Sequence, residues 1–208
     1  MLRLNELKYY IKNTFIWHLL LLFVFCGLSM LIVSFRNLSP TDSAAVMEQY
    51  LIFIGIILFA PIVWPECDKK IWDLVSCKKY DSCISIVIRV VLSCILVISI
   101  VLIYEFILFN GHCKFNFFKL FLGSTAEQIF IGSIAFFFSA LLNNIIVGYM
   151  VPILYYLMNL GGIDFGVFAL FQMKKGMYSF WPMMLIVGLL LIFLGSIIRN
   201  KITFYVVK

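Results

Sequence analysis

Six apolar runs, each close to the length needed to cross a lipid bilayer, fill most of this chain. A helical span needs about 20 largely apolar residues. Of the 208 residues, 64% are hydrophobic and 12% are charged, whereas soluble domains carry about 25% charged residues. The sequence therefore predicts an all-α integral membrane protein, with residues 1–208 forming a single transmembrane domain. The expected spans cover residues 14–35, 44–64, 84–109, 126–142, 145–160 and 180–198.

Lys and Arg are distributed unequally between alternate connections. Ten of them fall on the side that holds both termini, and five on the other side. Because cytoplasmic loops are enriched in Lys and Arg, we expect a multi-pass protein of the cell membrane with both termini in the cytoplasm. The net charge of +6 follows from this orientation, and we expect no binding to nucleic acid.

The first thirteen residues have the pattern of a short amphipathic helix. Leu4, Leu7 and Ile11 recur at helical spacing among charged residues. Such a segment lies in the membrane interface, so we expect an interfacial helix over residues 1–13. The alternative is an ordinary polar N-terminus that extends the first span.

The one sizeable polar break, PECDKKIWDLVSCKKYDS at residues 65–82, has the start signals of a helix. Pro65 suits the first helical position. Glu66 and Asp68 follow where the helix dipole favours negative charge. The sequence therefore predicts a short cytoplasmic helix over residues 66–76.

This short helix carries an apolar edge. Ile71, Leu74 and Val75 fall at i, i+3 and i+4, with Trp72 beside them. A helix of about a dozen residues is marginal alone in water, so a membrane surface or a protein must cover that edge. Two interpretations remain open: a docking helix for a soluble subunit, or a loop that lies on the membrane.

Taken together, these patterns make the chain similar to the membrane (permease) subunit of a type 2 ATP-binding-cassette (ABC) transporter, the exporter class with six spans per subunit. The likeness covers nearly the full length. It includes the N-terminal elbow LRLNELKYYIK, a second span ending in Pro65 and Glu66, the coupling helix ECDKKIWDLVS, Arg89 early in the third span, and a short fifth span followed by GGIDFGVFALF. The large outer domains of some relatives are absent here.

The resemblance implies a dimer of membrane subunits, identical or homologous, that carries separate nucleotide-binding ATPase subunits. ATP and Mg would then be bound on those partner chains. This chain has no G-x-x-x-x-G-K-[ST] motif, and we expect a non-catalytic subunit without a cofactor of its own. The residues expected to dock the ATPase are Glu66, Asp68, Lys69, Lys70, Ile71, Trp72, Asp73, Leu74 and Val75.

Charged residues and prolines within the spans are candidates for gating or for the pathway. Arg89 is expected either to reach the inner headgroups or to pair with Glu66 or Asp68, since a charge within a span is costly. Glu105 is expected to reach water, to pair with Lys114 or to line the outer exit. Pro61 and Pro152 can bend their spans, which suits a moving bundle.

Two further expectations concern the outer side and the fourth span. The short apolar stretches 115–122 and 163–173 are predicted to be interfacial or re-entrant. Ser124 and Glu127 match a capping box, which predicts that the fourth helix begins there.

An apolar, aromatic-rich pathway favours an amphipathic peptide, a lipid or a hydrophobic compound as substrate. Two other classes of protein remain: a non-transporting immunity or scaffold protein, and the substrate-binding membrane subunit of a vitamin importer. The first would not need a coupling helix. Subunits of the second kind often carry an Ala-x-x-x-Ala contact in the first span, which FIWHLLLLFVFCGLSMLIVSF lacks.

Overall fold

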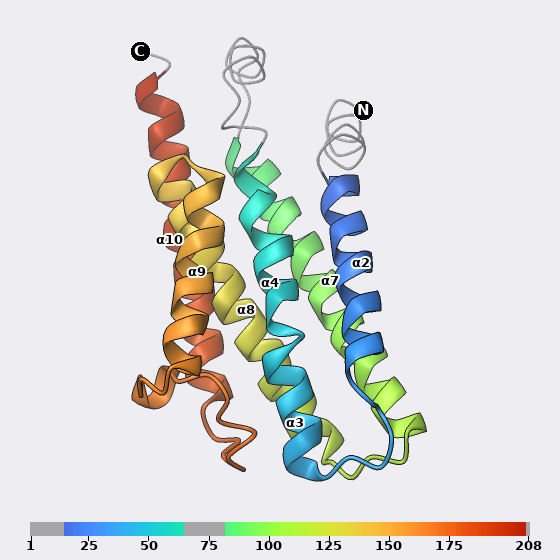
Figure 1. Ribbon diagram of the computed structural model, residues 1–208. Helices are drawn as coiled ribbons and strands as arrows, with labels where there is room; N and C mark the ends of the chain where they lie inside the picture. The colour runs from blue at the N-terminus through green and yellow to red at the C-terminus, as the bar shows by residue number, and fades with distance from the viewer. Residues whose placement is uncertain (1–14, 65–81, 207–208) are drawn as a thin grey trace.

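The computed structural model describes residues 15–64 and 82–206 (Figure 1). Within these ranges the chain is helical and contains no strand, which confirms the all-α class for this part of the chain. The elements are α2 (Ile16–Ile32), α3 (Pro40–Gln49), α4 (Ile52–Phe59), the 3₁₀ helix η2 (Ala60–Val63), α7 (Ser82–Asn110), α8 (Phe117–Leu142), α9 (Ile145–Leu160), the 3₁₀ helix η3 (Gly166–Phe168) and α10 (Trp181–Val206).

In the described part of the chain, four helical stretches are long and apolar enough to cross a membrane. α2 and α9 are apolar but shorter, with 17 and 16 residues, which is at or just below the usual lower limit of about 17 for a span. The four long stretches are Pro40–Val63, Ile84–Asn110, Phe117–Leu142 and Trp181–Arg199.

The chain runs back and forth between two ends of the bundle (Figure 1). The start of α2, the end of η2, the start of α7, the turn between α8 and α9, and the end of α10 share one end. We call it the Trp64 end. The connections 33–39, 111–116 and 161–180 share the other, the Asn110 end. Consecutive long segments are therefore antiparallel.

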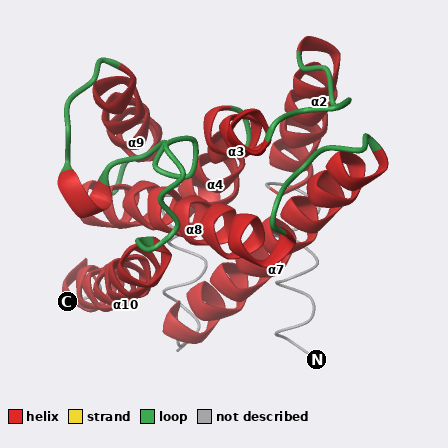
Figure 2. Cartoon of the chain, turned by 90° about the horizontal axis from the view of Figure 1, so that it is seen from below, coloured by secondary structure: helices red, strands yellow, loops and turns green. Residues whose placement is uncertain are grey.

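α8 lies at the centre of the bundle and packs against α4, α7, α9 and α10 (Figure 2). The Pro40–Val63 stretch is also central: 83% of its most apolar 18 residues are buried. In Trp181–Arg199 the buried share of the corresponding 18 residues is 22%. Large apolar side chains on α2, α7, α9 and α10 consequently face outwards, for example Phe23, Phe106 and Phe193. Such faces suit lipid or another membrane chain.

α4 and α8 cross at a contact made possible by glycine. A Cβ atom on Gly55 would overlap the carbonyl oxygen of Gln128 and lie 3.1 Å from its carbonyl carbon. On the opposite helix, a Cβ atom on Gly132 would lie 2.7 Å from the ring of Phe59. Small residues of this kind let membrane helices approach closely.

The predicted capping box at Ser124 is wrong. α8 begins at Phe117, where the side chain of Asn116 accepts a hydrogen bond from the backbone N–H of Lys119 at 3.3 Å. Ser124 is buried within the helix and donates its hydroxyl to the carbonyl oxygen of Leu120 at 2.7 Å. Because the helix's own carbonyls accept such hydroxyl groups, the polar residues at this point do not interrupt it.

The second expected span also starts earlier than predicted. Ser39 caps α3 by accepting a hydrogen bond from the backbone N–H of Asp42 at 3.2 Å, and Pro40 occupies the first turn. The predicted elbow helix over 1–13 and the predicted coupling helix over 66–76 lie outside the described residues.

Candidate functional site

Arg89 ties α7 to the end of the preceding segment. Its side chain is 8% exposed, and Nη1 donates a hydrogen bond to the carbonyl oxygen of Ile62 at 3.0 Å. One turn further along α7, the hydroxyl of Ser93 donates to the carbonyl oxygen of Leu58 at 3.2 Å. Carbonyls at a helix C-terminus have no partner within the helix, and Arg89 satisfies one of them in η2, where Pro61 also lies.

Glu105 is buried in the apolar interior rather than exposed to water. It is 0% exposed, and neither carboxylate oxygen has a hydrogen-bond partner among the described residues. The expectations that it reaches water or bonds to Lys114 are therefore wrong, because the inward face of α7 that it shares with Val101 and Leu108 packs into the core. A role in lining an exit stays a prediction.

Pro152 lies inside α9, one turn after a close contact of this helix with α8 at Gly148. Pro152 has no N–H to donate to the carbonyl of Gly148, four residues earlier. A Cβ atom on Gly148 would lie 2.7 Å from the Cβ atom of Ser139 and 2.9 Å from the carbonyl oxygen of Ala135. The interrupted hydrogen bond and the close contact thus coincide.

The residues predicted to dock an ATPase, Glu66 and 68–75, lie outside the described part of the chain. The structure instead brings together a polar cluster that the sequence did not single out. It lies near the Asn110 end, between α3, α8 and the 161–180 connection, which we call the 161–180 segment.

Glu48 is the centre of this cluster. It is 0% exposed, and its carboxylate accepts hydrogen bonds from two successive backbone N–H groups. Met173 donates to Oε1 at 2.6 Å and Lys174 donates to Oε2 at 2.9 Å. The donors lie in a turn that is closed by a bond from the N–H of Gly176 to the carbonyl of Met173 at 2.9 Å. Glu48 therefore anchors the 161–180 segment to α3.

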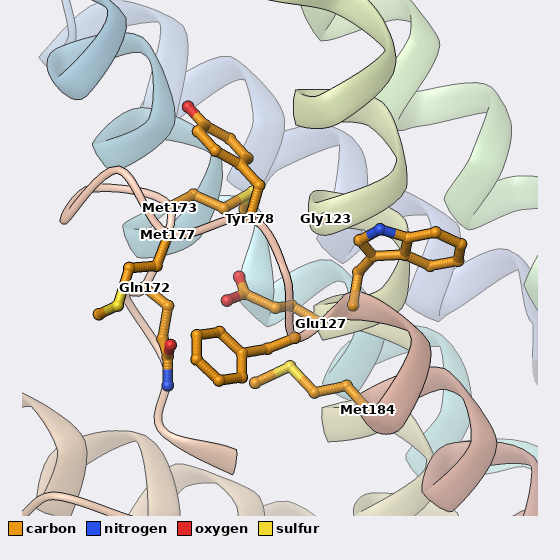
Figure 3. Close-up of a pocket in the computed structure, with 9 residues that line it drawn as sticks. Gly123, Glu127, Gln172, Met173, Met177, Tyr178 and Met184 are labelled. Carbon is orange, nitrogen blue, oxygen red and sulfur yellow. The ribbon is translucent and has the colours of Figure 1, made fainter. Parts of the chain in front are cut away.

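Glu127 on α8 is the second carboxyl group of the cluster. It is 4% exposed, and its carboxyl is within hydrogen-bond reach of that of Glu48. Figure 3 shows it projecting towards the turn that carries Gln172 and Met173. Since an ionised carboxylate only accepts hydrogen bonds, a bond between two carboxyl groups requires one proton. We call these two residues the Glu48–Glu127 pair.

A small cavity adjoins Glu127 (Figure 3). It offers about 10 Å³ to the centres of water molecules, so it takes water but no larger ligand. Gln172 lines it and is 5% exposed; its Nε2 donates to the carbonyl of Gly166 at 2.6 Å, while its Oε1 has no partner in the described part of the chain. The cluster therefore holds an unused acceptor beside a carboxyl group.

Two side chains of α9 also hold the 161–180 segment. Asn159 accepts a hydrogen bond from the backbone N–H of Leu170 at 2.8 Å, and the hydroxyl of Tyr155 donates to the carbonyl oxygen of Phe168. The segment is thus fixed at one side by α9 and at the other by Glu48.

Tyr178 lies at the edge of the cluster, where burial and nearby charges affect the pKa of its hydroxyl. Burial, and next the negative charge of Glu48, raise the pKa of its hydroxyl. The ammonium of Lys119 lies 5.9 Å from the centre of the same ring. Across residues 15–64 and 82–206, no three His, Cys, Asp or Glu side chains gather into a group that could hold a metal ion.

Sequence reasoning missed Glu48 because it treated the residue as part of an apolar span. The available signal was its charge, since an ionisable residue inside a membrane span marks a functional site by default. The position of its partners gave no signal, because Met173 lies 125 residues away in the sequence.

The fold and the cluster define a class of protein, an all-α membrane protein with a buried carboxyl pair near one end. No protein-family model, curated protein or solved structure matches the chain.

Proposed function

We propose that this chain is the membrane (permease) subunit of a type 2 ABC exporter. Two such subunits, identical or homologous, form the pathway, and separate ATPase subunits bind ATP and Mg. In this proposal α2, the α3–η2 segment, α7, α8, α9 and α10 make six membrane crossings. The Trp64 end faces the cytoplasm with both termini, and the chain itself is not an enzyme.

The main support for this proposal is the path of the chain at the Trp64 end. Residues 65–81 connect the end of η2 to the start of α7, two segments that are packed together. Arg89 and Ser93 bond α7 directly to the carbonyls of Ile62 and Leu58. A force applied to residues 66–76 would therefore move both segments as one unit, as a coupling helix requires.

The substrate proposed from the sequence is an amphipathic peptide, a lipid or a hydrophobic compound. An open groove of about 310 Å³ between α8, α9, α10 and the 161–180 segment supports it. The groove is lined by the aromatic side chains of Phe130, Tyr155, Phe165 and Phe168, together with Ile134, Val187 and Leu191. Pockets of this kind bind apolar groups.

The test is co-purification in mild detergent. The wild-type chain is compared with a Trp72→Ala, Leu74→Asp double variant, and the partner is recognised as a soluble ATPase that carries the phosphate-binding motif absent here. We expect the wild type to retain the ATPase and the variant to lose it, because the variant removes an aromatic anchor and places a charge on the apolar edge.

The matched control makes the same two chemical changes at the Asn110 end. Phe118 is 75% exposed and Ile163 is 49% exposed, so a Phe118→Ala, Ile163→Asp variant leaves the core intact. It should retain the ATPase. If no ATPase accompanies the wild type, the exporter proposal fails and the immunity or scaffold class is preferred.

A further inference from the structure

We propose that the Glu48–Glu127 pair is a proton-binding latch that holds the 161–180 segment against α3 and α8 and releases it when the shared proton is lost. This inference goes beyond the proposed function and does not depend on an ATPase. It rests on the hydrogen bonds of the cluster, on the burial of its members and on the unused acceptor beside them.

The docked arrangement gives the two carboxyl groups different roles. Glu48 accepts two backbone N–H groups, at 2.6 and 2.9 Å, which is the environment of an ionised carboxylate. Among the described residues, no comparable set of donors faces Glu127, whose carboxyl is within hydrogen-bond reach of that of Glu48. The shared proton therefore lies on Glu127 and is donated to Glu48.

Loss of that proton leaves two negative charges in contact. The proton passes to water, both groups become carboxylates, and neither can donate to the other. Like charges this close repel strongly where water is excluded. Separation of the 161–180 segment from α3 and α8 lets water reach both groups and relieves the repulsion.

Among residues 15–64 and 82–206, few charged or titratable groups face the pair from the elements packed around it. Lys174 and Tyr178 belong to the 161–180 segment, and Tyr155 belongs to α9. Trp181 and Met184 of α10, which line the adjoining cavity, do not titrate. Lys174 is exposed at the surface, so its attraction for Glu48 is partly screened and does not replace the proton.

Gln172 is the independent observation that points to a polar ligand at this site. Among the described residues, its Oε1 is buried beside Glu127 without a donor. An orphaned buried acceptor is costly, and a water in the cavity would supply the missing donor, because the single proton of Glu127 is already donated to Glu48. Such a water would lie beside Glu127 and would take up the proton that the pair releases.

Linkage fixes the sign of the pH dependence. The docked state holds the shared proton, whereas carboxyl groups that face water are ionised near neutral pH. The docked state therefore binds one proton more, and docking weakens as the pH rises. While the docked pair keeps its proton and the separated carboxyl groups are ionised, the docking equilibrium falls about tenfold per pH unit.

The experiment is hydrogen exchange of the full-length chain in detergent, followed by mass spectrometry of peptides covering residues 170–177. Rates are divided by the intrinsic exchange rate at each pH, and a peptide from the middle of α8 serves as the internal reference. In the wild type, protection of 170–177 should fall about tenfold per pH unit between mildly acidic and mildly alkaline conditions, while the reference stays constant. Unchanged protection in the wild type overturns the proposal without the need for any variant.

Three variants separate the roles of the residues. Glu127→Gln donates to Glu48 through an amide that does not titrate, so protection should stay high at every pH. Glu48→Gln loses the charged acceptor of two N–H groups, so protection should be low at every pH. Glu105→Gln also changes a buried carboxyl but leaves the cluster intact, and it should behave as the wild type. A Glu127→Gln variant that keeps the wild-type pH response contradicts the latch.

Discussion

Substituting Gly55 by alanine tests whether the close crossing of α4 and α8 holds the bundle together. The new Cβ atom would overlap the carbonyl oxygen of Gln128. The obstacle is backbone, which cannot turn aside as a long side chain can. The helices must separate by on the order of 1 Å to restore ordinary van der Waals contact. Gly132 and Phe59 lie in the same crossing, so that separation also loosens their packing.

The expected magnitude follows from two opposing terms. Overpacking of a well-packed interior costs about 1–3 kcal/mol, and a backbone obstacle places Gly55→Ala near the upper value. Replacing glycine by alanine within a helix gains about 0.5–1 kcal/mol. The net loss for Gly55→Ala is therefore about 2 kcal/mol.

Gly27→Ala is the matched control, because Gly27 also lies within a helix but has no atom within 4 Å of its ideal Cβ position. It carries the same helical gain without the overlap. The assay is thermal unfolding in detergent, followed by the loss of the monodisperse species. We expect Gly55→Ala to melt below the wild type and Gly27→Ala at or above it. Equal melting temperatures for the two variants would show that the crossing of α4 and α8 tolerates a Cβ atom at position 55.

Two further substitutions test the buried charges of α7. Glu105→Leu should raise the melting temperature, because it removes a buried carboxyl that has no partner among the described residues. Such an unsatisfied group costs about 1–3 kcal/mol. A lower melting temperature would show that the carboxyl is satisfied in the membrane. Arg89→Met should destabilise the protein by about 1–3 kcal/mol, because it removes the side chain that donates a hydrogen bond to the carbonyl oxygen of Ile62. The same change at the exposed Arg36 should have little effect, and equal losses at both positions would argue against a specific role for Arg89.

The helices were largely predictable because apolar length is a local property. The expected fifth span, residues 145–160, coincides with α9, and the third, 84–109, lies within α7. The start of α8 was not predictable in this way. The polar residues at 123–125 interrupt the apolar pattern, but Ser124 and Thr125 bond to carbonyls of their own helix. Hydropathy alone does not contain that information.

The polar cluster was not predictable, because it depends on contacts between distant parts of the chain. Glu48 is one acidic residue in a long apolar run, and nothing near it in the sequence marks Met173 and Lys174 as its donors. Glu127 was predicted to cap a helix; it lies instead in the middle of α8, where only the packed bundle brings it to Glu48. Glu105 likewise lies near the end of a span in sequence but inside the core in space.

Photo-crosslinking from residue 72 tests the proposed function most directly. A photoreactive amino acid replaces Trp72 in the full-length chain within native membranes, and the same amino acid replaces the exposed Phe118 at the opposite end as the control. We expect position 72 to crosslink to a soluble ATPase and position 118 to give no such adduct. Absence of an ATPase adduct at position 72, or equal adducts at both positions, would contradict the assignment of residues 66–76 as a coupling helix.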